Sequence, residues 1–124
     1  MSKIIHTPNA PEAIGPYSQA VVAGNLVFTS GQIPINPKTG NVEKTDIKSQ
    51  TIQVCENLKA VLESAGTSIE KAVKTTCFLQ NMEDFAEFNE VYASYFTGKP
   101  ARSCVAVKAL PKGVLVEVEV VAEK

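Results

Sequence analysis

The 124-residue sequence predicts an α+β domain: a mixed, mainly antiparallel sheet of about six strands with two helices on one face, in the order βββαβαββ. Short β-rich runs separated by glycine and proline turns occupy residues 3–31, and two stretches with helical spacing of apolar residues lie between residues 46 and 96. Two further β-rich runs follow residue 100. Each helix offers one apolar stripe, so the two helices together can cover only one face of the sheet. We expect residues 1–124 to form a single domain, because this length suits one hydrophobic core.

The N-terminal part of the chain predicts three strands and a loop. Residues 3–6 can form a short first strand, which a polar, proline-containing segment follows. Gly24-Asn25 lies between residues 21–23 and 26–30 at the spacing of a two-residue hairpin turn. Residues 32–45 contain two prolines and a glycine, which is typical of a loop with tight turns.

Two helices and an intervening strand are expected in the middle of the chain. Residues 46–65 place apolar side chains at helical spacing, Asp46 can cap the N-terminus, and Gly66 stands where a helix commonly ends. Residues 73–79 are rich enough in β-branched side chains for a strand. The second helix is expected from about residue 82 to 96, and its apolar stripe consists of Phe85, Phe88, Tyr92, Tyr95 and Phe96.

Residues 100–107 and 114–121 have the pattern of two antiparallel strands joined by a proline- and glycine-containing turn. Side chains alternate across the two faces of a strand. The second run therefore has one face made entirely of valines, and we expect this face, together with Val105 and Val107, to point into the core.

The opposite face of this expected hairpin would carry Arg102 and Cys104 together with Glu117 and Glu119. Pairing at the turn would place Cys104 opposite Glu117, and Arg102 opposite Glu119. Several small or apolar residues share this face, so it is too apolar for an ordinary solvent-exposed surface. We expect it to contact other subunits of an oligomer, with sites at the interfaces.

Composition and charge disfavour several classes of function. The net charge is −1 and no cluster of lysine and arginine occurs, which disfavours nucleic acid and anionic membranes as partners. No apolar run approaches the ~20 residues that span a bilayer, and the N-terminus does not resemble a signal peptide, so a cytoplasmic location is expected. Three widely separated cysteines and a single histidine, His6, disfavour a disulfide framework, a metal site and a histidine-dependent triad.

Arg102 and Glu117 are the strongest candidates for chemistry. The guanidinium of Arg102 presents a rigid fork that matches a carboxylate, and it keeps its charge at any working pH. The alternative is a structural ion pair with Glu119 or Glu117. Glu117 lies in an alternating apolar strand, where an unpaired carboxylate is costly. It could position or deprotonate a water molecule, or it could simply pair with a cation.

Four other residues have both a structural and a functional interpretation. Cys104 has no histidine to activate it, which favours a small buried side chain, although its backbone could contact a ligand. Asn89 lies beside the aromatic stripe of the second helix and could satisfy nearby backbone or brace a pocket wall. Tyr17 and Ser30 follow or precede glycine-containing turns, and each could be a turn residue or a polar pocket group.

Three motifs, taken together, resemble the YjgF/Rid family of reactive-intermediate deaminases. Residues 13–20, Ala-Ile-Gly-Pro-Tyr-Ser-Gln-Ala, are similar to the amino-terminal motif of that family, and residues 28–34, Phe-Thr-Ser-Gly-Gln-Ile-Pro, to its second motif. Residues 100–105, Pro-Ala-Arg-Ser-Cys-Val, with Leu110-Pro111 and residues 116–118, resemble its carboxy-terminal signature. The likeness spans nearly the whole chain.

The resemblance implies a chorismate-mutase-like fold assembled as a homotrimer, with clefts between subunits. It also implies an activity that needs no cofactor or metal: hydrolysis of 2-imino acids, such as 2-iminobutanoate and 2-iminopropanoate, to 2-oxo acids and ammonia. Arg102 would hold the substrate carboxylate, and Glu117 would position the attacking water. The cleft would be lined by Tyr17, Ser30, Gly31, Asn89 and the backbone of Cys104.

Other functions compete with the deaminase. The same Arg102 cleft could hold a stable 2-oxo acid without turnover, as a regulatory binding module. Glu117 discriminates against this alternative, because a binder of anions has little need of a nearby carboxylate. A ribonuclease or translation inhibitor is disfavoured by the acidic pI and the lack of a basic cluster. A chaperone role would rest only on the apolar face and the three cysteines.

Overall fold

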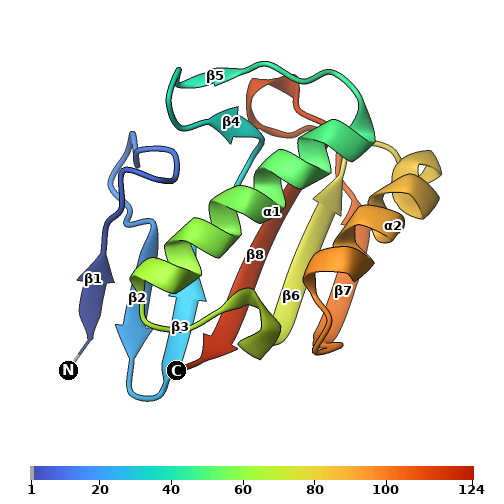
Figure 1. Ribbon diagram of the computed structural model, residues 1–124. Helices are drawn as coiled ribbons and strands as arrows, with labels where there is room; N and C mark the ends of the chain where they lie inside the picture. Colours follow the sequence, from blue (N-terminus) through green and yellow to red (C-terminus); the bar gives the residue numbers. More distant parts are fainter. Residues whose placement is uncertain (1) are drawn as a thin grey trace.

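The computed structural model describes residues 2–124, which form a six-stranded sheet with two α-helices packed on one face (Figure 1). The predicted fold class and element order are confirmed. In their order across the sheet, the strands are β1 (Lys3–Ile5), β2 (Ala20–Ala23), β3 (Leu26–Thr29), β8 (Val116–Glu123), β6 (Ala72–Leu79) and β7 (Ala101–Ala106). The helices are α1 (Ile47–Ser64) and α2 (Phe85–Tyr95). The expected loop after β3 contains a small two-stranded sheet, β4 (Ile35–Asn36) with β5 (Asn41–Val42).

Helix α1 begins and ends at the residues that its sequence predicts. The Asp46 carboxylate accepts a hydrogen bond from the backbone N–H of Ser49 at 2.9 Å, which satisfies one of the free N–H groups of the first turn. After the last turn, Gly66 takes a left-handed conformation with a φ of 86°. Helix α2 follows a short 3₁₀ turn, Met82–Asp84, within the predicted range.

The hydrophobic core lies between the two helices and the sheet. Alternate residues of the central strand β8 supply its floor, since Val116, Val118 and Val120 are all buried. Leu58 of α1 and Phe88 of α2 are fully buried above this floor. The valine face predicted for this strand therefore points into the core as expected.

The expected hairpin between the last two strands is wrong. Strand β6 lies between them: β8 pairs with it antiparallel, and β7 pairs with it in parallel as the outermost strand of the sheet. Alternation determines which residues share a face of a strand, but it does not choose the neighbouring strand. The segment between the two strands crosses the end of β6 and includes the 3₁₀ turn Pro111–Gly113.

The corrected pairing also changes which side chains share a face. Residues that are directly paired point to the same side of a sheet. Arg102 pairs with Thr75, which is buried against α2, so Arg102 lies on the helix-covered side. Glu117 pairs with Phe78, which in turn pairs with Val105, so all three lie on the uncovered side. Val105 is 46% exposed there, contrary to its expected place in the core.

Among residues 2–124, no helix combines the length and the apolar character needed to cross a membrane.

Candidate functional site

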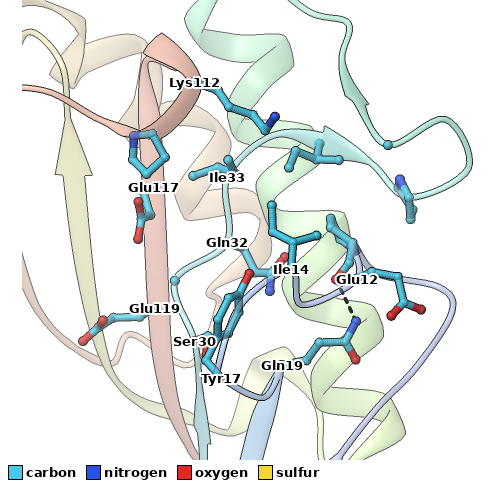
Figure 2. A pocket seen from close by; sticks show the side chains of 16 residues that line it. Glu12, Ile14, Tyr17, Gln19, Ser30, Gln32, Ile33, Lys112, Glu117 and Glu119 are labelled. Atoms are coloured by element: carbon cyan, nitrogen blue, oxygen red, sulfur yellow. Dashed lines mark hydrogen bonds between the residues drawn. The ribbon is translucent and has the colours of Figure 1, made fainter.

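The predicted site residues fall into two groups on opposite faces of the sheet. Arg102 and Asn89 line a shallow cavity of about 590 Å³ between β7 and α2. A larger cavity, of about 810 Å³, is lined by Tyr17, Ser30, Gly31 and Glu117 (Figure 2). We call these the arginine cavity and the glutamate cavity. Cys104 lines neither of them. It lies two residues beyond Arg102 on β7, with its side chain on the helix-covered side.

The guanidinium of Arg102 is held by helix α2. Its Nη1 donates a hydrogen bond to Oδ1 of Asn89 at 2.6 Å. The guanidinium carbon lies 4.7 Å from the ring centroid of Tyr92 and 5.3 Å from that of Phe85, both distances typical of a cation–π contact. These three contacts orient the charged fork, and the single bond to Asn89 leaves its other N–H groups for a ligand.

The aromatic platform under Arg102 is itself fixed. The hydroxyl groups of Tyr92 and Thr75 are 2.8 Å apart, and the ring of Tyr92 stacks on Phe96 with their centroids 4.4 Å apart. Burial raises the pKa of Tyr92, so its hydroxyl stays protonated at neutral pH. The arginine is thus held on a rigid, neutral surface.

Within residues 2–124, no carboxylate pairs with Arg102. Over residues 2–124, the only ion pairs are His6 with Glu12 and Lys48 with Glu90. The structural ion pair of Arg102 with Glu117 or Glu119 is therefore wrong within one subunit. A buried or half-buried guanidinium without an anionic partner is suited to an incoming carboxylate.

Glu117 packs directly against the backbone of Gly31. A methyl group added at Gly31 would come within 2.9 Å of Cδ and 3.1 Å of Cγ of Glu117, so any larger residue there would displace the Glu117 carboxylate from its present position. Burial raises the pKa of Glu117, and the neighbouring negative charge of Glu119 raises it further. Glu117 is therefore a stronger base than an ordinary surface glutamate.

Two further predicted residues of the glutamate cavity, Ser30 and Tyr17, lie in loops. The hydroxyl of Ser30 donates to the backbone oxygen of Ser18 at 2.6 Å, so its oxygen retains lone pairs for a ligand. Tyr17 is half exposed, and its backbone N–H donates to Gly15 at 2.8 Å in a tight turn.

Several residues of the glutamate cavity were not among the predicted site residues. Ile14, Ile33 and Lys112 line it, and Figure 2 shows them around its opening with the labelled carboxylates. Lys112 has a φ of 56°, a left-handed conformation that is unfavourable for a side-chain-bearing residue. The Pro-Lys-Gly sequence indicates a turn there, but only the fold brings this turn to the cavity.

The thiols are not activated. Cys104 pairs with Cys77 across β6 and β7, and burial raises the pKa of both. The prediction that Cys104 has a small packed side chain rather than a nucleophile agrees with this environment. In the part of the chain from residue 2 onward, no three or more His, Cys, Asp or Glu side chains are placed to hold a metal ion.

Comparison with known proteins gives consistent matches. The family described as Endoribonuclease L-PSP matches residues 7–124. A RutC family protein of Pyrococcus horikoshii is 58% identical, covering 100% of this chain and 99% of that protein. The 2-iminobutanoate/2-iminopropanoate deaminase of Escherichia coli K12 is 51% identical, covering 98% of both proteins. The crystal structure of E. coli TdcF with bound serine has a TM-score of 0.94 and 46% identity, covering 98% of both chains. Since these names differ in activity, the match alone does not identify the reaction.

Proposed function

Because the chain belongs to the L-PSP family, the YjgF/Rid family that its motifs resemble, we propose that it hydrolyses 2-imino acids to 2-oxo acids and ammonia. The substrates proposed are 2-iminobutanoate and 2-iminopropanoate, which the name of the E. coli relative specifies for that protein. Neither a cofactor nor a metal takes part in the proposed reaction. The expected cytoplasmic location stays a prediction.

One observation carries the proposal: Arg102 and Glu117 lie on opposite faces of one sheet, and neither has an ionic partner among the described residues 2–124. Arg102 faces the helix layer and Glu117 the uncovered side, so one small molecule cannot contact both within a subunit. We place the active site in a cleft between subunits, where the β7 edge of one subunit meets the glutamate cavity of the next. A head-to-tail contact of this kind forms a ring when the rotation between subunits closes, and we propose a closed ring of three subunits, a homotrimer.

In this cleft Arg102 binds the substrate carboxylate. Asn89 and the rings of α2 already orient the guanidinium, so little ordering is needed when the substrate binds. Charge-assisted hydrogen bonds of a guanidinium to a carboxylate are worth roughly 1.5–3 kcal/mol each. Two such bonds would fix the imine carbon relative to the neighbouring subunit. The backbone of Cys104, on the same edge strand, is proposed to line the cleft.

Glu117 positions and activates the attacking water. As the water oxygen bonds to C2 of the imine, its proton passes to the carboxylate. With the imine protonated at nitrogen, this addition leaves an amino group and a hydroxyl group on C2. Glu117 returns its proton to the nitrogen, and as the C–N bond breaks the carboxylate takes the remaining proton of the hydroxyl. The C2=O bond forms, and ammonia and the 2-oxo acid leave. The raised pKa of Glu117 brings it closer to neutral pH, where a general base works best. Ser30 and Tyr17 are proposed to complete the polar wall.

The charges of the glutamate cavity disfavour the competing ribonuclease. Three carboxylates, those of Glu12, Glu117 and Glu119, line it with a single cation, Lys112. A polyanion would be repelled from this surface. A binding module for small 2-oxo acids is the second candidate, and the serine in the TdcF structure supports a small carboxylate ligand in this family.

A coupled assay tests the proposal. A threonine dehydratase generates 2-iminobutanoate, and the rate of 2-oxobutanoate formation is compared for wild type, Arg102→Ala, Arg102→Lys and no addition. We expect acceleration by the wild type, none above background with Arg102→Ala, and a large loss with Arg102→Lys, which keeps the charge but lacks the fork. A folded, oligomeric wild type that does not accelerate the reaction would reject the deaminase and favour the binding module.

A further inference from the structure

One wall of the glutamate cavity is an irregular segment, residues 7–14. Pro11, Glu12 and Ile14 line the cavity from this segment, and Figure 2 shows Glu12 and Ile14 at its opening. The segment contains no helix or strand, and Ile14 is 79% exposed. In the described chain, no backbone-to-backbone hydrogen bond joins residues 7–14 to another segment. Something other than regular structure must therefore keep this wall in place.

The side chain of Gln19 supplies the missing hydrogen bonds. Its Oε1 accepts from the backbone N–H of Thr7 at 2.7 Å. Its Nε2 donates to the backbone oxygens of Pro11 at 2.8 Å and Thr7 at 3.0 Å, with a longer contact to Ala10 at 3.4 Å. The dashed line in Figure 2 marks the bond from Gln19 to this wall. The side-chain amide of Gln19 thus takes the place of the backbone hydrogen bonds that a neighbouring strand would have provided.

Gln19 is well placed to act as a rigid anchor. It is only 2% exposed, so water does not compete for its bonds. Its own backbone oxygen accepts from the N–H of Ser30 at 2.9 Å, which ties it to a second residue of the cavity. The opposite wall is held in the same way, because the buried Asn57 of α1 donates to the backbone oxygens of Ile33 and Ile35 at 3.3 and 3.0 Å.

We propose that Gln19 is a positioning residue for substrate binding: its buried amide holds residues 7–14 as a preformed wall of the glutamate cavity. This inference rests on the proposed function for its kinetic consequence. The two proposed catalytic groups, Arg102 and Glu117, are carried by the sheet and do not depend on this wall. Loosening the wall therefore weakens substrate binding and leaves the chemical step intact.

The test compares Gln19→Met, Gln19→Glu and a matched control, Thr67→Val. Methionine has a similar length and no amide, and glutamate keeps an acceptor for Thr7 but lacks both donors. The control removes another buried side-chain bond to backbone, from the Thr67 hydroxyl to the oxygen of Glu123, and Thr67 does not line the cavity. This control shows how a loss of stability alone affects KM and hydrogen exchange. The glutamate variant also serves if the methionine variant does not fold.

Two measurements are made on each oligomeric protein. Hydrogen exchange should accelerate at the amide of Thr7, whose N–H Gln19 binds directly, in the Gln19 variants and not in Thr67→Val. In the coupled assay, the KM for 2-iminobutanoate should rise about tenfold in the Gln19 variants while kcat stays within about twofold of wild type. Thr67→Val should retain the wild-type KM even where its melting temperature falls equally.

Unchanged exchange at the amide of Thr7, an unchanged KM, or an equal rise in KM for Thr67→Val would each overturn the role of Gln19. The exchange measurement does not depend on catalysis. If the wild type hydrolyses no imine, the proposed function fails, while the exchange data still decide whether Gln19 anchors the wall.

Discussion

Mixing two inactive variants is the sharpest test of a cleft shared between subunits. Arg102→Ala removes the proposed carboxylate-binding fork, and Glu117→Gln removes the proposed base without changing the size of the side chain. If each cleft takes Arg102 from one subunit and Glu117 from its neighbour, a mixed ring contains clefts in which both residues are native. Each variant supplies what the other lacks, so activity should return on mixing.

The expected recovery follows from the geometry. Losing two charge-assisted bonds, at roughly 1.5–3 kcal/mol each, lowers kcat/KM by about a hundredfold to ten-thousandfold, so Arg102→Ala alone contributes little background. In a random, equal mixture, each of the two required residues is native with a probability of one half. About a quarter of the clefts are then fully native, whatever the number of subunits in the closed ring.

The assay is the dehydratase-coupled formation of 2-oxobutanoate after the two variants are unfolded, mixed and refolded together. Mass spectrometry of the intact assembly, with one variant carrying a tag, verifies that subunits have exchanged. Each variant refolded alone is the control. If verified mixed rings show only the sum of the two separate activities, Arg102 and Glu117 do not share a cleft in the way proposed, and the reasoning from opposite sheet faces fails.

Three further predictions concern single groups. Gly31→Ala should lower kcat about tenfold, because the added methyl group collides with the Glu117 carboxylate and displaces it. The circular dichroism spectrum should be unchanged, and a wild-type kcat would contradict the close packing of Glu117 against Gly31. Glu119→Gln removes a negative charge that raises the pKa of Glu117, so the acid limb of the kcat/KM–pH profile should move to lower pH. If this limb does not move, Glu117 is not the base whose titration the profile records. Tyr92→Phe leaves the buried Thr75 hydroxyl without its hydrogen-bond partner at 2.8 Å, and it should lower the free energy of unfolding, measured by urea titration, by about 1–2 kcal/mol. An unchanged free energy of unfolding would show that this hydrogen bond does not stabilise the fold.

Much of the fold could be predicted because its signals are local. The capping Asp46 and the glycine after α1 lie within one turn of the helix that they delimit, and the turn at Gly24-Asn25 joins adjacent strands. The neighbour of β7 could not be predicted in this way. Either β6 or β8 could in principle pair with β7, and the alternation of side chains along a strand does not determine which of them does.

The candidate site, too, could be predicted only as far as local sequence signals determine it. The motifs indicated Arg102 and Glu117 as candidates, but the mistaken hairpin placed them side by side on one face. Their separation on two faces emerged only from the register of three strands. Ile14, Gln19 and Lys112 belong to loops whose convergence on one cavity depends on tertiary contacts, and no spacing along the chain signals it.

The alternation of β8 links the interior of the protein to its candidate chemistry. Glu117 faces the uncovered side, while Val116 and Val118, its covalent neighbours, are completely buried beneath the helices. A change of volume at either valine cannot be absorbed by a flexible loop, because a central strand paired on both sides transmits any displacement along its backbone. Residues that never touch a ligand can therefore change the direction of the Glu117 carboxylate, and the interior and the proposed reaction centre must vary together.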